Sequence, residues 1–245
     1  MKTNLCERLA LALDNTDDPS RLAALIQSTA PWIGIYKIGL EQFIRFGPPV
    51  LDVVRAAKRK IFLDLKLHDI PNTVAQAVAS ACDLGVDFLT VHTQGGSEML
   101  AAAVKARDAR SGSGRPAIIG VTLLTSIGAP MLRGELGVDV DVQEYVRRLG
   151  RLAVISGIDG IVCSAADLAS VAPVLPPGFI TITPGIRPAG SDLNDQQRIA
   201  TPAAAIASGA TILVLGRAVT SAADPAEAAK RIYDEIERAA DSAGK

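Results

Sequence analysis

Eight short apolar runs alternate with longer, alanine-rich amphipathic segments, and this alternation constrains the fold more than any other feature of the chain. The apolar runs cover residues 8–13, 34–40, 60–67, 87–93, 117–124, 160–164, 179–183 and 211–215. Helical patterns between them cover residues 19–30, 42–58, 73–84, 98–110, 142–155 and 202–208. Apolar strands that alternate with helices are typical of a parallel sheet covered by helices. Eight repeats predict an α/β fold, a single-domain (β/α)8 TIM barrel.

The size and composition of the chain agree with one barrel domain over residues 1–245. The chain has 245 residues, of which 49% are hydrophobic, and no Pro/Gly/Ser-rich linker divides it. A net charge of −1 argues against a nucleic-acid partner. No apolar run reaches the roughly 18 residues of a spanning helix, so we expect a cytoplasmic protein with no membrane partner. Three cysteines without ligand-like spacing predict reduced thiols rather than disulfides or a zinc site.

Charged residues of alternating sign interrupt the third apolar run. Side chains alternate between the faces of a strand, so Asp64 and Lys66 project from one face, opposite the leucines of the run. Burying two charges costs several kcal/mol per ion unless they pair closely or face a polar cavity. A structural ion pair is the alternative, but with Lys37 and Asp69 expected close by, the pattern indicates a functional site.

Other polar residues are expected at the same end of the barrel, because barrel enzymes place their chemistry at the C-terminal ends of the strands. Asp14, Lys37, His92 and Thr125 all lie in or just after strand runs. Each has a simpler interpretation: Asp14 as a turn cap, Lys37 as a lysine that extends from a strand end, and His92 as a packing residue. We leave His92 out of the site. Two histidines on different strands without a compact carboxylate set predict no metal site.

The seventh and eighth runs lead into glycine and arginine. Gly185 and Arg187 follow the seventh run, and Gly216 and Arg217 follow the eighth. Loops in these positions often bind phosphate in barrels, and arginine can hold phosphate bidentately. The polar stretch 187–197 is then expected to be a closing lid rather than an ordinary loop, and 126–141 either shapes the cavity or is passive surface.

The last helix has a clear start signal. Asp224 can cap it, Pro225 suits its first position and Glu227 its third. This helix is expected to pack on the barrel, with a solvated charged face.

Taken together, these motifs resemble the orotidine 5'-phosphate decarboxylase family over the whole chain. The resemblance rests on LALD (11–14), YKIG (36–39), DLKLHDIPNT (64–73), LTS (124–126), TPGIRP (183–188), DQ (195–196) and LGR (215–217). The pattern Asp-x-Lys-x-x-Asp is shared with related sugar-phosphate decarboxylases and synthases. The Ile-Pro-Asn-Thr extension, Pro-Gly-Ile-Arg and Gly-Arg, in this order, favour the pyrimidine enzyme.

The resemblance implies decarboxylation of orotidine 5'-monophosphate to uridine 5'-monophosphate, the last step of UMP biosynthesis, with no cofactor and no metal. Lys66 would protonate the ring carbon that loses carbon dioxide, within a network of Lys37, Asp64, Lys66 and Asp69. A preplaced ammonium suits this chemistry, because carbanion character develops on that carbon. Asp64 would lie against the substrate carboxylate, and would either destabilise that ground state or fix Lys66.

The resemblance also implies how the substrate is held. Asp14, Lys37, Asp69 and Thr73 would contact the ribose or order the charges, and Thr125 would bind the pyrimidine. The phosphate would be held by Arg187, Gln196, Gly216 and Arg217, with the role of the adjacent Gln197 left open. The family is dimeric, so a homodimer is expected, in which Asp69 and Thr73 reach the neighbouring subunit's site.

Two alternatives remain at this stage. One is a related magnesium-dependent phosphosugar decarboxylase or synthase of the same barrel group, which would be sensitive to chelators. The other is a phosphate-ligand sensor without catalysis, which would bind nucleotide tightly and turn nothing over.

Overall fold

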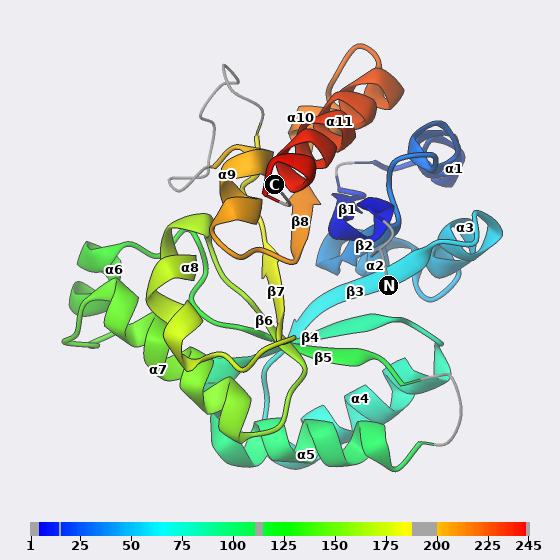
Figure 1. Ribbon diagram of the computed structural model, residues 1–245. Helices are drawn as coiled ribbons and strands as arrows, with labels where there is room; N and C mark the ends of the chain where they lie inside the picture. Colours follow the sequence, from blue (N-terminus) through cyan, green and yellow to red (C-terminus); the bar gives the residue numbers. More distant parts are fainter. Residues whose placement is uncertain (1–4, 15, 111–114, 188–199, 244–245) are drawn as a thin grey trace.

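The computed structural model describes residues 5–14, 16–110, 115–187 and 200–243, and these form a closed barrel of parallel strands surrounded by helices (Figure 1). The strands follow the chain order around the barrel, and the first pairs with the last. Their bounds are β1 Leu9–Ala12, β2 Ile35–Gly39, β3 Lys60–Leu67, β4 Phe88–His92, β5 Ala117–Val121, β6 Gly160–Val162, β7 Ile180–Thr183 and β8 Ile212–Leu215. The predicted (β/α)8 barrel and each of its eight strands are therefore confirmed, with most strands shorter than predicted by one to three residues at an end.

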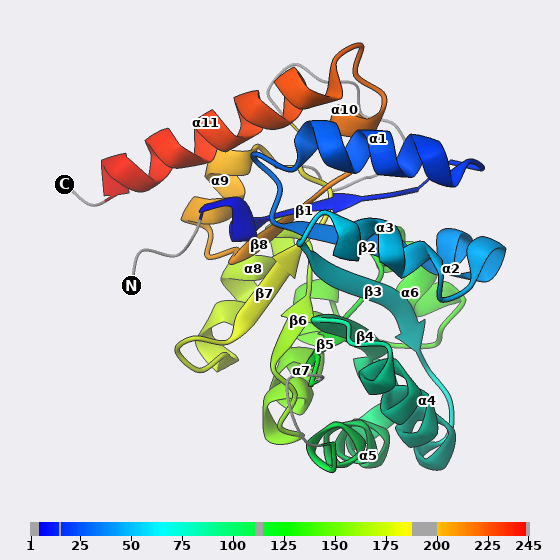
Figure 2. The ribbon, with the colours of Figure 1, turned by 90° about the vertical axis from the view of Figure 1, so that its right-hand side faces the viewer.

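Helices cover the outside of the barrel. Their bounds are α1 Pro19–Thr29, α2 Leu40–Phe46, α3 Val50–Ala56, α4 Pro71–Asp83, α5 Gly96–Asp108, α6 Ala129–Gly134, α7 Val142–Ile155, α8 Ala165–Val171, α9 Pro202–Ala207, α10 Arg217–Thr220 and α11 Pro225–Ala243. Three short 3-10 helices cover Leu5–Arg8, Thr93–Gly95 and Ala172–Val174. Helices α4 and α5 lie side by side, as do α1 and α11 (Figures 1 and 2). No helix within the described ranges is long and apolar enough to cross a membrane.

The single helix predicted over 42–58 is wrong, because the structure has two helices there, α2 and α3. Gly47 separates them with a φ of +66°, a conformation that glycine adopts without steric cost. Pro48 and Pro49 follow, and a proline cannot donate the N–H that a continuous helix needs. Three further helices, α6, α8 and the short α10, were not predicted.

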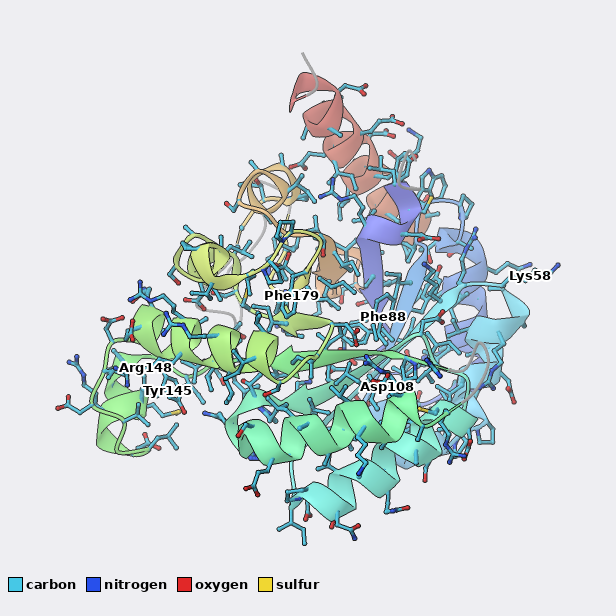
Figure 3. All side chains as sticks on the ribbon, turned by 60° about the horizontal axis from the view of Figure 1, so that its bottom comes forward. Lys58, Phe88, Asp108, Tyr145, Arg148 and Phe179 are labelled. Atoms are coloured by element: carbon cyan, nitrogen blue, oxygen red, sulfur yellow. The ribbon has the colours of Figure 1, made fainter. Side chains whose placement is uncertain are left out.

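Two apolar layers hold the barrel together. The inner layer fills the barrel itself and includes Phe62, Phe88, Ile119 and Ile182. The outer layer lies between the strands and the helices, where Leu63 and other buried aliphatic residues pack. Phe88 lies near the centre of the molecule in Figure 3, whereas Arg148 lies toward its edge. Alternate residues of each strand thus face inward and outward, as strand geometry requires.

The predicted start of the last helix is also confirmed. The carboxylate of Asp224 accepts the backbone N–H of Glu227 at 3.0 Å, and Pro225 is the first residue of α11. The three cysteines are free thiols, with Cys82 and Cys163 buried.

Candidate active site

A cavity of about 470 Å³ opens at the C-terminal ends of the barrel strands. Its base is apolar and belongs to the inner layer of the barrel, with Phe62, Ile182 and Val214 among its residues. Its walls are polar and carry most of the residues that the sequence predicts as a site: Asp14, Lys37, Asp64, Lys66, Thr125, Arg187, Gly216 and Arg217. A cavity with an apolar base and a few convergent charged groups is typical of a small-molecule site.

Four charged side chains of alternating sign form one cluster on the cavity wall. Nζ of Lys66 donates to Oδ2 of Asp64 at 2.8 Å. Nζ of Lys37 lies 3.4 Å from the same oxygen and 3.5 Å from Oδ1 of Asp14. The Asp64 side chain is only 9% exposed, whereas that of Lys66 is 31% exposed, so Lys66 is the more accessible member of this pair.

Asp64 is held ionised although it is buried. Burial alone would raise the pKa of this carboxyl, because the charged form loses its hydration. The charges of Lys37 and Lys66, together with hydrogen bonds from Lys66 and Thr90, outweigh burial and leave the pKa of Asp64 below its usual value. The cluster therefore presents a fixed negative charge beside the Lys66 ammonium.

Strand β3 is irregular at the point where it carries Lys66. Its register with β4 shifts between Leu63 and Leu67, and Lys66 has a φ of +50°. This left-handed conformation costs a residue with a side chain roughly 1–2 kcal/mol. The strand pattern correctly predicts that Asp64 and Lys66 project together, but the register shift and the positive φ at Lys66 have no signature in the sequence.

Thr90 of β4 contacts both charged residues and was not singled out in the sequence. Its side-chain oxygen donates to Oδ1 of Asp64 at 2.9 Å and accepts the backbone N–H of Lys66 at 2.8 Å. The available signal was a hydroxyl in the middle of an otherwise apolar strand.

The opposite wall of the cavity carries the glycines and arginines predicted to bind phosphate. Gly185 has a φ of +77°, which explains why a glycine follows Pro184 there. The backbone N–H of Arg187 donates to the carbonyl of Ala200 at 3.0 Å, which fixes the base of the 187–200 connection. Arg217 is the first residue of α10, directly after Gly216. Gln196, Gln197 and most of the predicted lid lie outside the described residues.

Asp69 and Thr73 lie apart from the cavity within one chain. Both are exposed, and neither is among the described residues that line the cavity. The carboxylate of Asp69 accepts the backbone N–H of Ile70 at 2.7 Å. Figure 2 shows this segment between the end of β3 and the start of α4. The predicted charge network is thus brought together at Lys37, Asp64 and Lys66, but not at Asp69.

His68 and His92 lie beside each other at the ends of β3 and β4, with ring centroids 5.3 Å apart. Burial lowers the pKa of His92, and the nearby charges of His68 and Lys66 act in the same direction. His92 does not line the cavity as far as the chain is described.

Comparison with known proteins identifies the family. The sequence profile of the orotidine 5'-phosphate decarboxylase / HUMPS family matches residues 7–232. The chain belongs to this family. An orotidine 5'-phosphate decarboxylase of Moorella thermoacetica is 44% identical over 237 residues, which cover 94% of this chain and 92% of that protein. One from Halorhodospira halophila is 46% identical over 229 residues, with 94% and 95% covered.

A solved structure of the family agrees with the fold. The orotidine 5'-phosphate decarboxylase of Lactobacillus acidophilus superposes with a TM-score of 0.81 at 34% identity, and the match covers 94% of this chain and 99% of that one. The family resemblance found in the sequence motifs is therefore confirmed along nearly the whole chain.

Proposed function

We propose that this protein decarboxylates orotidine 5'-monophosphate to uridine 5'-monophosphate and carbon dioxide, the last step of UMP biosynthesis, without a cofactor and in the cytoplasm. The observation that carries the proposal is the contact of Lys66 with buried Asp64 on the wall of the barrel cavity. Family membership and the names of the relatives support the substrate.

Lys66 supplies the proton. When the bond between the ring carbon and the carboxylate breaks, carbon dioxide leaves and the electron pair stays on the ring carbon. The Lys66 ammonium stabilises this developing charge and then transfers a proton to it, after which the lysine regains a proton from solvent. Asp64, which Lys37 also contacts, holds the ammonium in place, so little reorganisation is needed at the moment of reaction.

Different parts of the cavity bind different parts of the substrate. The nucleotide phosphate is held by Arg187, Gly216 and Arg217, with Gln196 from the lid, and Thr125 binds the pyrimidine. Asp14 and Lys37 bind the ribose, which lies between the phosphate and the pyrimidine. Phosphate binding far from the breaking bond supplies energy that closes the site and organises the transition state.

The active form is a homodimer in which Asp69 and Thr73 complete the neighbouring site. Their exposure outside their own chain's cavity supports this role. Large apolar side chains are exposed on α2 and on the loop after β3, at the ends of two paired strands: Leu40 is 48% exposed, Ile44 79% and Ile70 67%. An apolar surface beside Asp69 suits a subunit interface.

The test is a direct assay of the purified protein with orotidine 5'-monophosphate in the presence of a chelator, monitored by the loss of orotidylate absorbance. Turnover at the same rate with and without the chelator supports the proposal. Loss of activity that added magnesium restores would indicate the related magnesium-dependent phosphosugar enzymes instead. Tight nucleotide binding with no turnover would indicate a sensor.

A further inference from the structure

Thr90 lies on β4, and its side chain hydrogen-bonds both the carboxylate of Asp64 and the backbone of Lys66 on β3. It is fully buried, at 0% exposure, behind the cavity wall. Its hydroxyl donates to Oδ1 of Asp64 at 2.9 Å, while Oδ2 of Asp64 accepts from Lys66. Both oxygens of this carboxylate are therefore held, and its plane cannot rotate without breaking a contact.

The same hydroxyl holds the backbone of Lys66. In a regular parallel ladder the N–H of a strand residue donates to a backbone carbonyl of the next strand. At Lys66 the register has shifted, φ is +50°, and the N–H donates to Oγ1 of Thr90 at 2.8 Å. A left-handed residue with a side chain persists only where its surroundings enforce that conformation. The Thr90 hydroxyl supplies one such contact.

We propose that Thr90 is a positioning residue of the reaction. Its single hydroxyl holds both the Asp64 carboxylate and the left-handed backbone of Lys66, and so fixes the position of one relative to the other. The inference rests on the proposed decarboxylation, because Lys66 is the proton donor there. Thr90 does not line the cavity among the described residues, so it acts on the substrate only through Asp64 and Lys66.

The chemistry of the position restricts what can replace threonine. The group must donate one hydrogen bond and accept another from a short side chain, which serine can do and valine cannot. Valine has nearly the same shape, so Thr90→Val leaves Oδ1 of Asp64 buried without this donor and the N–H of Lys66 without this acceptor. An unsatisfied buried carboxylate oxygen favours a rotated carboxylate, and Lys66 moves with it.

The experiment compares four proteins in steady-state turnover of orotidine 5'-monophosphate: the wild type, Thr90→Val, Thr90→Ser and a control, Thr93→Val. Thr93 is also fully buried just past the end of β4, and its hydroxyl donates to the backbone carbonyl of Val121 at 2.8 Å. The control therefore removes a buried hydroxyl without touching the charged cluster. Melting temperatures report any general loss of stability.

We expect Thr90→Val to lower kcat about 10- to 100-fold, the effect of displacing a reacting group by about 1 Å. KM should stay within about threefold, because the residues proposed to bind the phosphate and the pyrimidine are unchanged. Thr90→Ser and Thr93→Val should both stay within about threefold of the wild type in kcat. Hydrogen exchange at the Lys66 amide, measured by NMR without substrate, should accelerate in Thr90→Val and stay slow in Thr90→Ser.

Three results would overturn the inference: a kcat of Thr90→Val equal to that of Thr93→Val, a Thr90→Ser variant as impaired as Thr90→Val, or unchanged exchange at the Lys66 amide. If Thr90→Val does not fold, Thr90→Ala takes its place. If neither folds while Thr90→Ser does, Thr90 is a determinant of folding and the positioning role is rejected. An inactive wild type would reject the proposed function, whereas the exchange measurement would still test the contact of Thr90 with Lys66.

Discussion

Mixing two inactive variants should restore activity if the active site is shared between subunits. Lys66 lines the cavity of its own chain, with Nζ 2.8 Å from Asp64. Asp69 is exposed outside that cavity. In homodimers of Lys66→Ala or of Asp69→Ala every site lacks one of the two groups, so each variant alone should be nearly inactive.

A mixed dimer should contain one intact site. That site receives Lys66 from one chain and Asp69 from the other, whereas the second site collects both defects. Random exchange between equal amounts of the two variants makes about half of the dimers mixed, and each has one working site of two, so about one quarter of wild-type activity should return.

The assay follows turnover after the two variants have been mixed under conditions that allow subunit exchange, with differently tagged chains to measure the mixed fraction. The control pair is Lys66→Ala with Lys37→Ala. Both lysines contact Asp64 in the same cavity, so no arrangement of these two chains yields an intact site and activity should stay low. If mixed dimers of Lys66→Ala and Asp69→Ala form but stay as inactive as their parents, Asp69 works within its own subunit and the shared-site proposal is wrong.

Four further predictions address single residues. Lys66→Ala should lose most turnover but keep measurable nucleotide binding by calorimetry, because its charge acts chiefly on the developing carbanion; near-normal turnover would remove it from the mechanism. Arg217→Ala should weaken transition-state stabilisation, measured from kcat/KM on the nucleotide, by about 2 to 5 kcal/mol, which is the usual cost of truncating one partner of a charge pair. An equal relative loss on the nucleoside without phosphate would contradict the role of Arg217 in phosphate binding. Asp224→Ala should lower the free energy of unfolding in urea by about 1 kcal/mol, because α11 loses its cap, and an unchanged midpoint would show that the cap contributes nothing. The pKa of Asp64 is lower in the folded protein than the value of about 3.9 for an unfolded carboxyl, so its ionised form stabilises the protein above that value. This contribution is lost as the pH falls through the folded pKa. Urea midpoints of Asp64→Asn should therefore depend less on pH below about pH 4 than those of the wild type, and equal dependence would contradict the shift.

The order of elements could be predicted because it depends on local pattern. Apolar runs with β-branched residues specify strands, and Asp224 with Pro225 specifies a helix start, through interactions within a few residues. The same local pattern failed over 42–58, where apolar periodicity continues across Gly47 and the two prolines although the backbone cannot remain helical there.

The sequence by itself determined the barrel, the end of it that carries the candidate site, and the pairing of Asp64 with Lys66, because period and motif spacing encode these features. Only the tertiary structure decided how β3 meets β4. The shifted register, the left-handed turn at Lys66 and the two hydrogen bonds of Thr90 depend on residues 24 and 26 positions apart in the chain. Such contacts are set by the way neighbouring strands pair in the closed barrel. No periodicity in either strand specifies which hydroxyl will meet which carboxylate.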